Sequence, residues 1–182
     1  VLLAREGASV VLMDQDESAA DETLAMIDAE GGRAATFIGD VTKEEDCRAA
    51  VGLAVERFGR LDILDNNVGI GGRGTVTETD DALWHRVMEV NVMSMVQMSR
   101  QAIPAMVDSG GGAIVNISSI SATHDLGTTY VSYSATNAAI LQLTQSVAMQ
   151  YAKKNIRANS ILPGFLNTPM VVESLTAAYG GD

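Results

Sequence analysis

Two hydroxyl-bearing residues stand where a sheet and a helix could bring them together. Ser119 follows the end of an apolar run, and Tyr133 falls in the first turn of the helix predicted after it. A serine hydroxyl and a phenol that converge on one carbonyl oxygen can polarise it, and the tyrosine can give or take the proton while a nicotinamide exchanges a hydride. An isolated helical tyrosine more often serves packing, and Tyr130, one turn earlier, is an alternative for this role.

Polar residues recur directly after the predicted strands, at the edge where parallel sheets bind ligands. They are Asp14, Asp40, Asn66 and Asn67, Ser118 and Ser119, and Asn167 and Thr168. A carboxylate at Asp14 could accept the ribose hydroxyls of a dinucleotide and repel a 2′-phosphate, although a solvated turn is the alternative. Asp40 with Val41 could flank an adenine ring, or Asp40 could cap the next helix. Five strand ends with polar groups favour a site.

The elements that would position these residues alternate between two periods. Short apolar runs predict strands at 10–13, 35–38, 61–64, 113–117 and 157–162, with a loop beginning at Asp65. Helical spacing predicts helices at 19–30, from just after Thr42 to about 58, at 81–107 and at 131–153. Thr42 with Glu45 suggests a capping box, Thr79 or Asp80 can cap the third helix, and Pro104 can kink it. This order predicts a parallel sheet in a single α/β domain over residues 1–182.

Composition narrows the classes of function. Twelve basic and 23 acidic residues in 182 give a net charge of −11, which disfavours nucleic acid and anionic lipid as partners. No apolar stretch approaches the length of a membrane span. The single cysteine, Cys47, excludes an internal disulfide and favours a reducing cytoplasm. His85 and His124 form no ligand spacing with it, so no metal site is predicted.

Six motifs in order resemble the short-chain dehydrogenase/reductase family from end to end. They are Asp40-Val41, Asn66-Asn67-Val68-Gly69, Asn91 in Glu-Val-Asn-Val, the strand 114–119 ending in Ser119, Tyr133 in Tyr-Ser-Ala-Thr-Asn, and the loop Pro163-Gly164-Phe165-Leu166-Asn167-Thr168. The resemblance implies a Rossmann-type, doubly wound parallel sheet in three αβα layers, here incomplete at both ends. It also implies an NAD(P)-dependent oxidoreductase that interconverts an alcohol and a ketone or aldehyde.

The resemblance assigns roles to individual positions. The catalytic set would be Asn91, Ser119, Tyr133 and Asn137. The cofactor-binding set would be Asp14, Asp40, Val41, Asn67, Val68, Gly69, Tyr133, Asn137, Pro163, Gly164, Leu166 and Thr168. Asp14 implies NAD rather than NADP. Family members are usually dimers or tetramers built on two long helices, here those around Asn91 and Tyr133. The methionines along the first of these helices are core residues or, alternatively, a subunit contact.

Three departures from the family pattern matter. Asn137 stands where the family has a lysine that lowers the pKa of the tyrosine and holds the nicotinamide ribose; Lys153 is about 30 Å further along the helix. The alternative is therefore a catalytically impaired dinucleotide-binding or oligomer-partner homologue. The family's first strand and glycine-rich loop would precede Val1, so we expect an internal fragment with a gap between two halves of the sheet. Asp65 replaces a usually apolar residue, for no evident reason.

Overall fold

In the described part of the chain, five strands, all parallel to their neighbours, form the centre of the molecule. The structure is a computed structural model in which residues 1–127, 129–167 and 172 are described. The strands are β1 (Ser9–Asp14), β2 (Arg33–Ile38), β3 (Ile63–Asn66), β4 (Gly112–Ile117) and β5 (Ile156–Ile161). They form one sheet of order β1-β2 and another of order β3-β4-β5. The predicted break between two halves of the sheet is confirmed.

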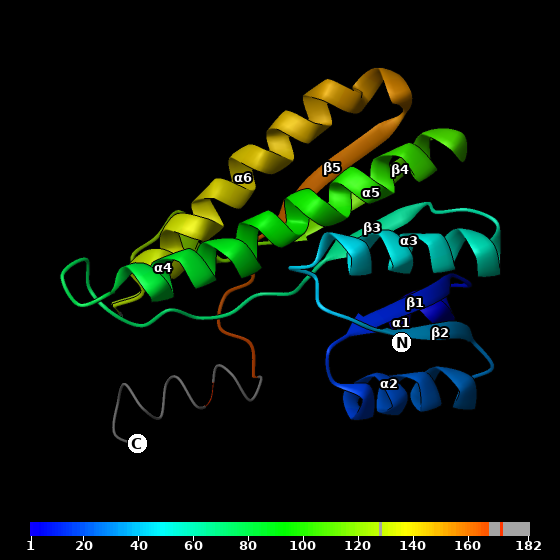
Figure 1. The fold of residues 1–182 in the computed structure, drawn as a ribbon, viewed down its shortest axis with the longest axis horizontal. Helices are drawn as coiled ribbons and strands as arrows, with labels where there is room; N and C mark the ends of the chain where they lie inside the picture. The colour runs from blue at the N-terminus through cyan, green and yellow to red at the C-terminus, as the bar shows by residue number, and fades with distance from the viewer. Residues whose placement is uncertain (128, 168–171, 173–182) are drawn as a thin grey trace.

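Helices cover both faces of these strands. They are α1 (Leu2–Arg5), α2 (Glu17–Ala29), α3 (Glu44–Phe58), α4 (Asp81–Met88), α5 (Ser94–Asp108) and α6 (Val131–Tyr151), with short helical segments η1 (Glu89–Met93), η2 (Ile120–Ala122) and η3 (Ala152–Lys154). In Figure 1, α3, α5 and α6 lie on one face and α2 on the other. This three-layer αβα arrangement confirms the predicted Rossmann-type fold. Among the described residues, no helix combines the length and apolar character needed to cross a membrane.

The start of α3 corrects one prediction. Thr42 does not cap this helix, because its N–H and its hydroxyl both donate to Oδ1 of Asp40, at 2.9 and 2.7 Å. The helix begins after Lys43, which provides no side-chain cap. Asp46, rather than Glu45, reaches back, and its Oδ2 accepts from the Asp40 N–H at 2.8 Å. At the start of α4, Asp80 is the cap, accepting from the Leu83 N–H, so one of the two predicted candidates is confirmed.

The third strand lies two residues later than predicted. Its residues pair with Ala113–Asn116 of β4, so Asp65 and Asn66 belong to the strand and not to a loop. The buried Asn66 amide donates to Oδ1 of Asn116 at 2.8 Å, and the Asn116 amide donates to Oγ1 of Thr144 on α6 at 2.8 Å. Polar residues can continue the strand because their hydrogen bonds are satisfied inside the sheet.

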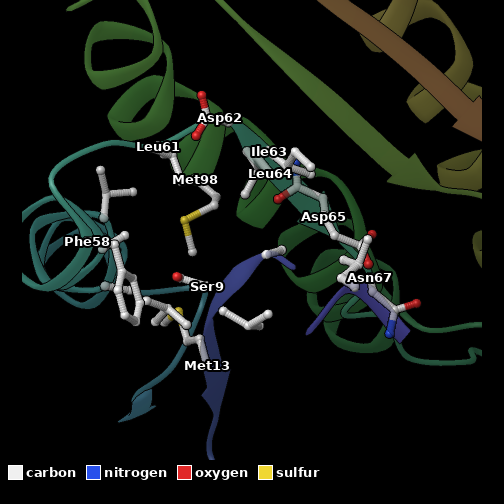
Figure 2. Close-up of a pocket in the computed structure, with 18 of the residues that line it drawn as sticks. Ser9, Met13, Phe58, Leu61, Asp62, Ile63, Leu64, Asp65, Asn67 and Met98 are labelled. Carbon is white, nitrogen blue, oxygen red and sulfur yellow. The ribbon is translucent and has the colours of Figure 1, made fainter. Parts of the chain in front are cut away.

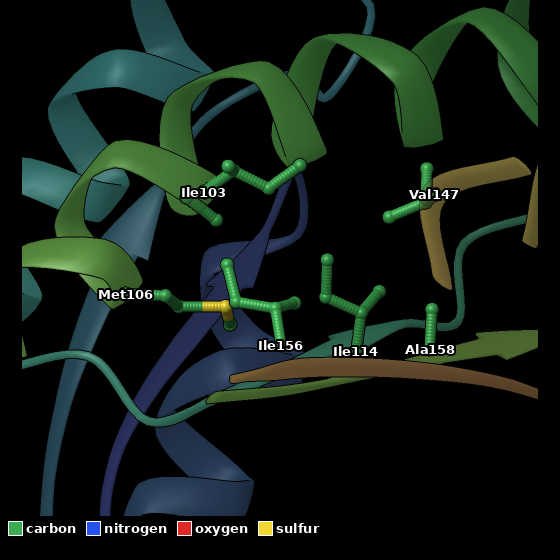
Figure 3. Packing of buried hydrophobic residues seen from close by; sticks show 7 residues of the cluster. Ile103, Met106, Ile114, Val147, Ile156 and Ala158 are labelled. Carbon is green, nitrogen blue, oxygen red and sulfur yellow. The ribbon is translucent and has the colours of Figure 1, made fainter. Parts of the chain in front are cut away.

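The core lies between the larger sheet and the helices above it. Figure 3 shows Ile103 and Met106 of α5 and Val147 of α6 packed against Ile114 of β4 and Ile156 of β5. The methionines of α5 are core residues, as expected, at three positions: Met95, Met98 and Met106 are buried. By contrast, the apolar run of β1 is only half-buried, because one edge of this strand faces the break between the sheets.

Candidate functional site

The loop after β3 is held in place by Asn91. Its Oδ1 accepts from the Ile70 N–H at 2.8 Å, and its Nδ2 donates to the Ile70 carbonyl at 2.9 Å. The same Nδ2 reaches Oγ1 of Thr136 on α6 at 3.3 Å. Asn91 lies in η1, a π-helical segment that interrupts the predicted continuous helix, and such segments are frequent at functional sites. One buried amide thus connects this loop to two helices.

Two glycines bring that loop close to the start of α6. A Cβ at Gly72 would lie 2.4 Å from Oγ of Ser132, so a larger residue cannot fit without a shift. Gly74 has a φ of 145° and forms an isolated parallel bridge with Tyr130. Sequence reasoning missed this docking and the role of Thr136. The run Gly-Gly-Arg-Gly was the available signal for a close backbone approach.

A hydrogen bond joins the end of β4 to α6. The Ser118 hydroxyl donates to the carbonyl of Asn137 at 3.0 Å. The buried Ser119 caps η2, its Oγ accepting from the Ser121 N–H at 3.2 Å, and η2 packs against α6. Tyr133 lies on α6 one turn before Asn137 and is half-buried. The structure therefore brings the turn that carries Ser119 against the helix that carries Tyr133.

Neighbouring side chains shape the surroundings of Tyr133. The ring of Tyr130 meets its ring edge-on, with centroids 6.4 Å apart. Asn137 is only 3% exposed, and its Nδ2 donates to the Tyr133 carbonyl at 2.9 Å. The amide at the position of the family's lysine is thus engaged with its own helix and brings no charge.

Two carboxylates lie at the ends of the smaller sheet. Asp14 is exposed at the end of β1, where its Oδ1 accepts from the Asp16 N–H at 3.0 Å. The hydrogen bond from the Thr42 N–H lowers the pKa of Asp40, which follows β2, despite its partial burial. Asp40 therefore stabilises the turn before α3 and does not cap that helix. Anionic acceptors suit the hydroxyls of a ribose and an amino group, so this edge fits the adenosine half of a dinucleotide.

The remaining candidates lie at the carboxyl ends of the larger sheet. Asn67, Val68 and Gly69 follow β3 and are exposed. The loop after β5 contains Pro163, Gly164 and Leu166. It contacts the Ser119 turn, because the Ile120 N–H donates to the Pro163 carbonyl at 3.1 Å. Thr168 lies outside the described residues. The described candidates thus form two groups, one on each side of the break between the sheets.

Asp65 lies on the wall of that break. It belongs to β3, and Figure 2 shows it beside Leu64 and Asn67 in the space between the sheets. Partial burial raises the pKa of its carboxyl group. By surface area Asp65 remains exposed to solvent, and the structure shows no function for it.

Known proteins match this chain over most of its length. Residues 1–178 match the family described as short chain dehydrogenase. A cyclohexanol dehydrogenase from Acinetobacter sp. (strain SE19) is 39% identical over 175 residues, which cover 95% of this chain and 69% of that protein. An L-sorbose reductase from Gluconobacter frateurii, solved with NADPH and L-sorbose, has a TM-score of 0.90 and 34% identity; the match covers 98% of this chain and 69% of that one. A 7α-hydroxysteroid dehydrogenase, solved with NADH and 7-oxo glycochenodeoxycholic acid, has a TM-score of 0.88 and 34% identity, covering 92% and 65%.

The matches cover most of this chain but only about two thirds of the length of its relatives. This chain spans 69% of the cyclohexanol dehydrogenase and as little as 62% of another curated relative. The matched region nevertheless contains every element described above. On the match of residues 1–178 and on relatives of about 40% identity, the chain belongs to the short-chain dehydrogenase family.

Proposed function

We propose that this protein is an NAD-dependent oxidoreductase that interconverts a secondary alcohol and a ketone. One observation carries the proposal: the Ser119 turn at the end of β4 packs against α6, and the Ser118 hydroxyl donates to the carbonyl of Asn137, one turn after Tyr133 on that helix. This arrangement supports a site formed by the Ser119 hydroxyl and the Tyr133 phenol at the carboxyl edge of a parallel sheet, where such folds bind their ligands. The matched relatives include dehydrogenases of cyclic alcohols, which supports this substrate class.

The chain's own residues supply binding, orientation and proton transfer. The phenol of Tyr133 takes the proton from the alcohol or returns it to the ketone oxygen. The Ser119 hydroxyl donates a hydrogen bond to the same oxygen. Asn91 holds the Ile70 loop against α6, the helix that carries Tyr133. A bound nicotinamide supplies hydride exchange.

The dinucleotide would lie across the carboxyl ends of both sheets. Asp14 would accept the adenosine ribose hydroxyls and repel a 2′-phosphate, which supports NAD over NADP. Asp40 and Val41 would border the adenine. The nicotinamide half would be held by residues of the larger sheet: Asn67, Val68, Gly69, Tyr133, Asn137, Pro163, Gly164, Leu166 and Thr168. Since one matched structure contains NADH and another NADPH, the choice for this chain depends on Asp14.

Asn137 supports a second candidate function, a dinucleotide-binding homologue with little or no catalysis. A tyrosine phenol in water ionises near pH ~10, and a neutral amide gives no electrostatic help at neutral pH. In addition, the Asn137 amide already donates to its own helix, so it must leave that bond to reach a ribose.

Association through the long helices is part of the proposal. Met93 in η1 and Met149 on α6, on the two helical segments concerned, are 42% and 76% exposed. A homodimer or homotetramer would cover them.

Cys47 is buried, and its thiol donates to the Val41 carbonyl at 3.3 Å. A reduced thiol fits the proposed cytoplasmic location.

The test begins with the protein as expressed from its own gene. NADH and NADPH fluorescence titrations measure binding, and we expect NADH to bind more tightly. Production of NADH from cyclohexanol, cyclopentanol and other secondary alcohols then measures turnover between pH 7 and pH 10. Slow turnover that rises with pH supports the oxidoreductase. Tight NADH binding without turnover at any pH favours the second candidate, and binding of neither cofactor contradicts both.

A further inference from the structure

One buried hydroxyl in the turn after β4 has no hydrogen-bond partner. Ser121, in the middle of η2, is 8% exposed, and its Oγ atom is shielded from solvent. Among the residues that the structure describes, this is the one buried side-chain oxygen or nitrogen without a partner. Buried polar groups in folded proteins almost always have a partner, so the exception requires an explanation.

The other hydroxyls of this turn are engaged. Ser119 Oγ accepts from the Ser121 N–H at 3.2 Å, and the Thr123 hydroxyl donates to the Ile120 carbonyl at 3.3 Å. Because Ser119 Oγ is the acceptor in its bond, its own proton remains available for a substrate oxygen. The Ser121 hydroxyl can both donate and accept, and the surrounding protein uses neither capacity.

The Ser121 hydroxyl lies close to the hydroxyl of Ser119. The Ser121 nitrogen is 3.2 Å from Ser119 Oγ, and Ser121 Oγ is three bonds away from that nitrogen. Covalent geometry therefore keeps the two Oγ atoms within about 7 Å of each other. Two hydrogen bonds of ~2.8 Å each, made to oxygens on adjacent carbon atoms, can span this separation. The separation thus suits one small molecule with two neighbouring oxygens.

We infer that Ser121 binds a second hydroxyl of the substrate, on the carbon next to the one that reacts, and that the preferred substrates are neutral vicinal diols and the corresponding α-hydroxy ketones. This inference rests on the proposed function and names the substrate class of the same site. In oxidation, the reacting carbon loses a hydride to the nicotinamide and its hydroxyl proton to Tyr133. The second hydroxyl stays intact and hydrogen-bonded to Ser121.

The surroundings of Ser121 favour a neutral hydroxyl over a carboxylate in this position. Residues 119–123 carry no charged side chain, and a buried carboxylate without a cation beside it is unfavourable. His124 follows this segment, but it is exposed, and its Nδ1 is engaged with Thr123 Oγ1 at 2.9 Å. A serine hydroxyl can satisfy a second hydroxyl by one neutral hydrogen bond.

A ligand reaches Ser121 only when a neighbouring segment shifts, because the Oγ atom is shielded from solvent. Two segments contact the turn: α6 packs against η2, and the loop after β5 accepts at its Pro163 carbonyl from the Ile120 N–H at 3.1 Å. In that loop, Phe165 and Leu166 are exposed. Exposed segments open at a lower free-energy cost than packed helices, so we expect the loop to shift when the diol binds.

Cyclohexane-1,2-diol and cyclohexanol are a matched pair of substrates, because they differ by a single hydroxyl. The assay measures kcat/KM for NADH formation from each, using the protein expressed from its own gene and both isomers of the diol. We expect the better isomer to exceed cyclohexanol at least ~10-fold. Ser121→Ala should lower kcat/KM for that isomer about 10-fold and change the value for cyclohexanol little. Thr123→Val, which removes a hydroxyl that already has a partner, should leave the ratio of the two values unchanged.

The thermal midpoint of the ligand-free protein provides an independent test. Removing a buried hydroxyl that has no partner costs no hydrogen bond, so Ser121→Ala should keep or raise the midpoint. A lower midpoint would show that the hydroxyl is bound within the protein, and it would overturn the inference.

A calorimetric titration keeps this inference separate from the proposed function. It measures the dissociation constants of the diol and of cyclohexanol in the presence of NADH and requires no turnover. If neither alcohol is oxidised, tighter binding of the diol that disappears in Ser121→Ala still supports the inference. It is overturned by absence of diol binding, by equal dissociation constants or equal kcat/KM for the two alcohols in the parent, or by an equal loss for both in Ser121→Ala.

Discussion

Replacing Asn137 by lysine tests how this chain handles the proton of Tyr133. A tyrosine in water ionises near pH ~10, so a phenolate that works at pH 7 requires stabilisation by about 3 pH units, or about 4 kcal/mol. An ammonium group one helical turn from Tyr133 can supply much of this, whereas the neutral amide of Asn137 cannot. Asn137→Lys should therefore raise the rate of alcohol oxidation at pH 7 by up to ~10³-fold.

The same substitution has a structural cost. It removes the hydrogen bond from Asn137 Nδ2 to the Tyr133 carbonyl, worth about 1 kcal/mol of folding free energy. Because position 137 is only 3% exposed, the longer side chain must extend along the helix towards the site. We expect a lower thermal midpoint together with the higher rate, and this combination distinguishes a catalytic gain from general stabilisation.

The assay is the initial rate of NADH formation from a secondary alcohol between pH 6 and pH 10. Asn137→Lys should exceed the rate of the parent protein at neutral pH. Asn137→Met is the matched control, with a long side chain and no charge. An unchanged rate in Asn137→Lys, or an equal gain in Asn137→Met, would refute the electrostatic reasoning.

Three further predictions concern stability. Asn116→Ala leaves two buried polar partners short of a hydrogen bond and should lower the free energy of unfolding in urea by about 2–4 kcal/mol, whereas Asn159→Ala at an exposed strand position should change it little. Gly72→Ala should destabilise by about 1–3 kcal/mol because of its close contact, while Gly52→Ala, in open space on α3, should stabilise by about 0.5–1 kcal/mol. Burial raises the pKa of Cys47 to about 11, so the unfolded thiol ionises first and stability should fall as pH rises from 9 towards 11; a slope that persists in Cys47→Ala would contradict this.

The arrangement of elements could be predicted because it depends on local signals. Each predicted strand and helix exists, and Asp80 was recognisable as a cap because a short acidic residue precedes a helical pattern. Thr42 gave the same signal, yet its hydroxyl binds Asp40 instead. Asp40 and Thr42 could each have capped the start of α3, and the sequence does not show that Thr42 donates to Asp40 instead.

Long-range hydrogen bonds were beyond sequence reasoning. Asn66 looked like a loop residue, and only its bond to Asn116, 50 positions away, explains why β3 continues through it. The same holds for Asn91: the resemblance assigned it a catalytic role, but its clamp on Ile70 becomes visible only when the loop and η1 are placed together. The break between the sheets could be predicted, because the family resemblance implies a central strand that would precede Val1 in the sequence.

The most direct measurement compares alcohol oxidation by Tyr133→Phe and Tyr130→Phe at the pH of the parent's fastest turnover. The two rings form a T-shaped contact with centroids 6.4 Å apart, so the two variants disturb similar surroundings. If Tyr133 moves the proton, Tyr133→Phe abolishes NADH formation while NADH binding persists, and Tyr130→Phe retains most of the parent's rate. Undiminished turnover in Tyr133→Phe would show that the proton moves through another group.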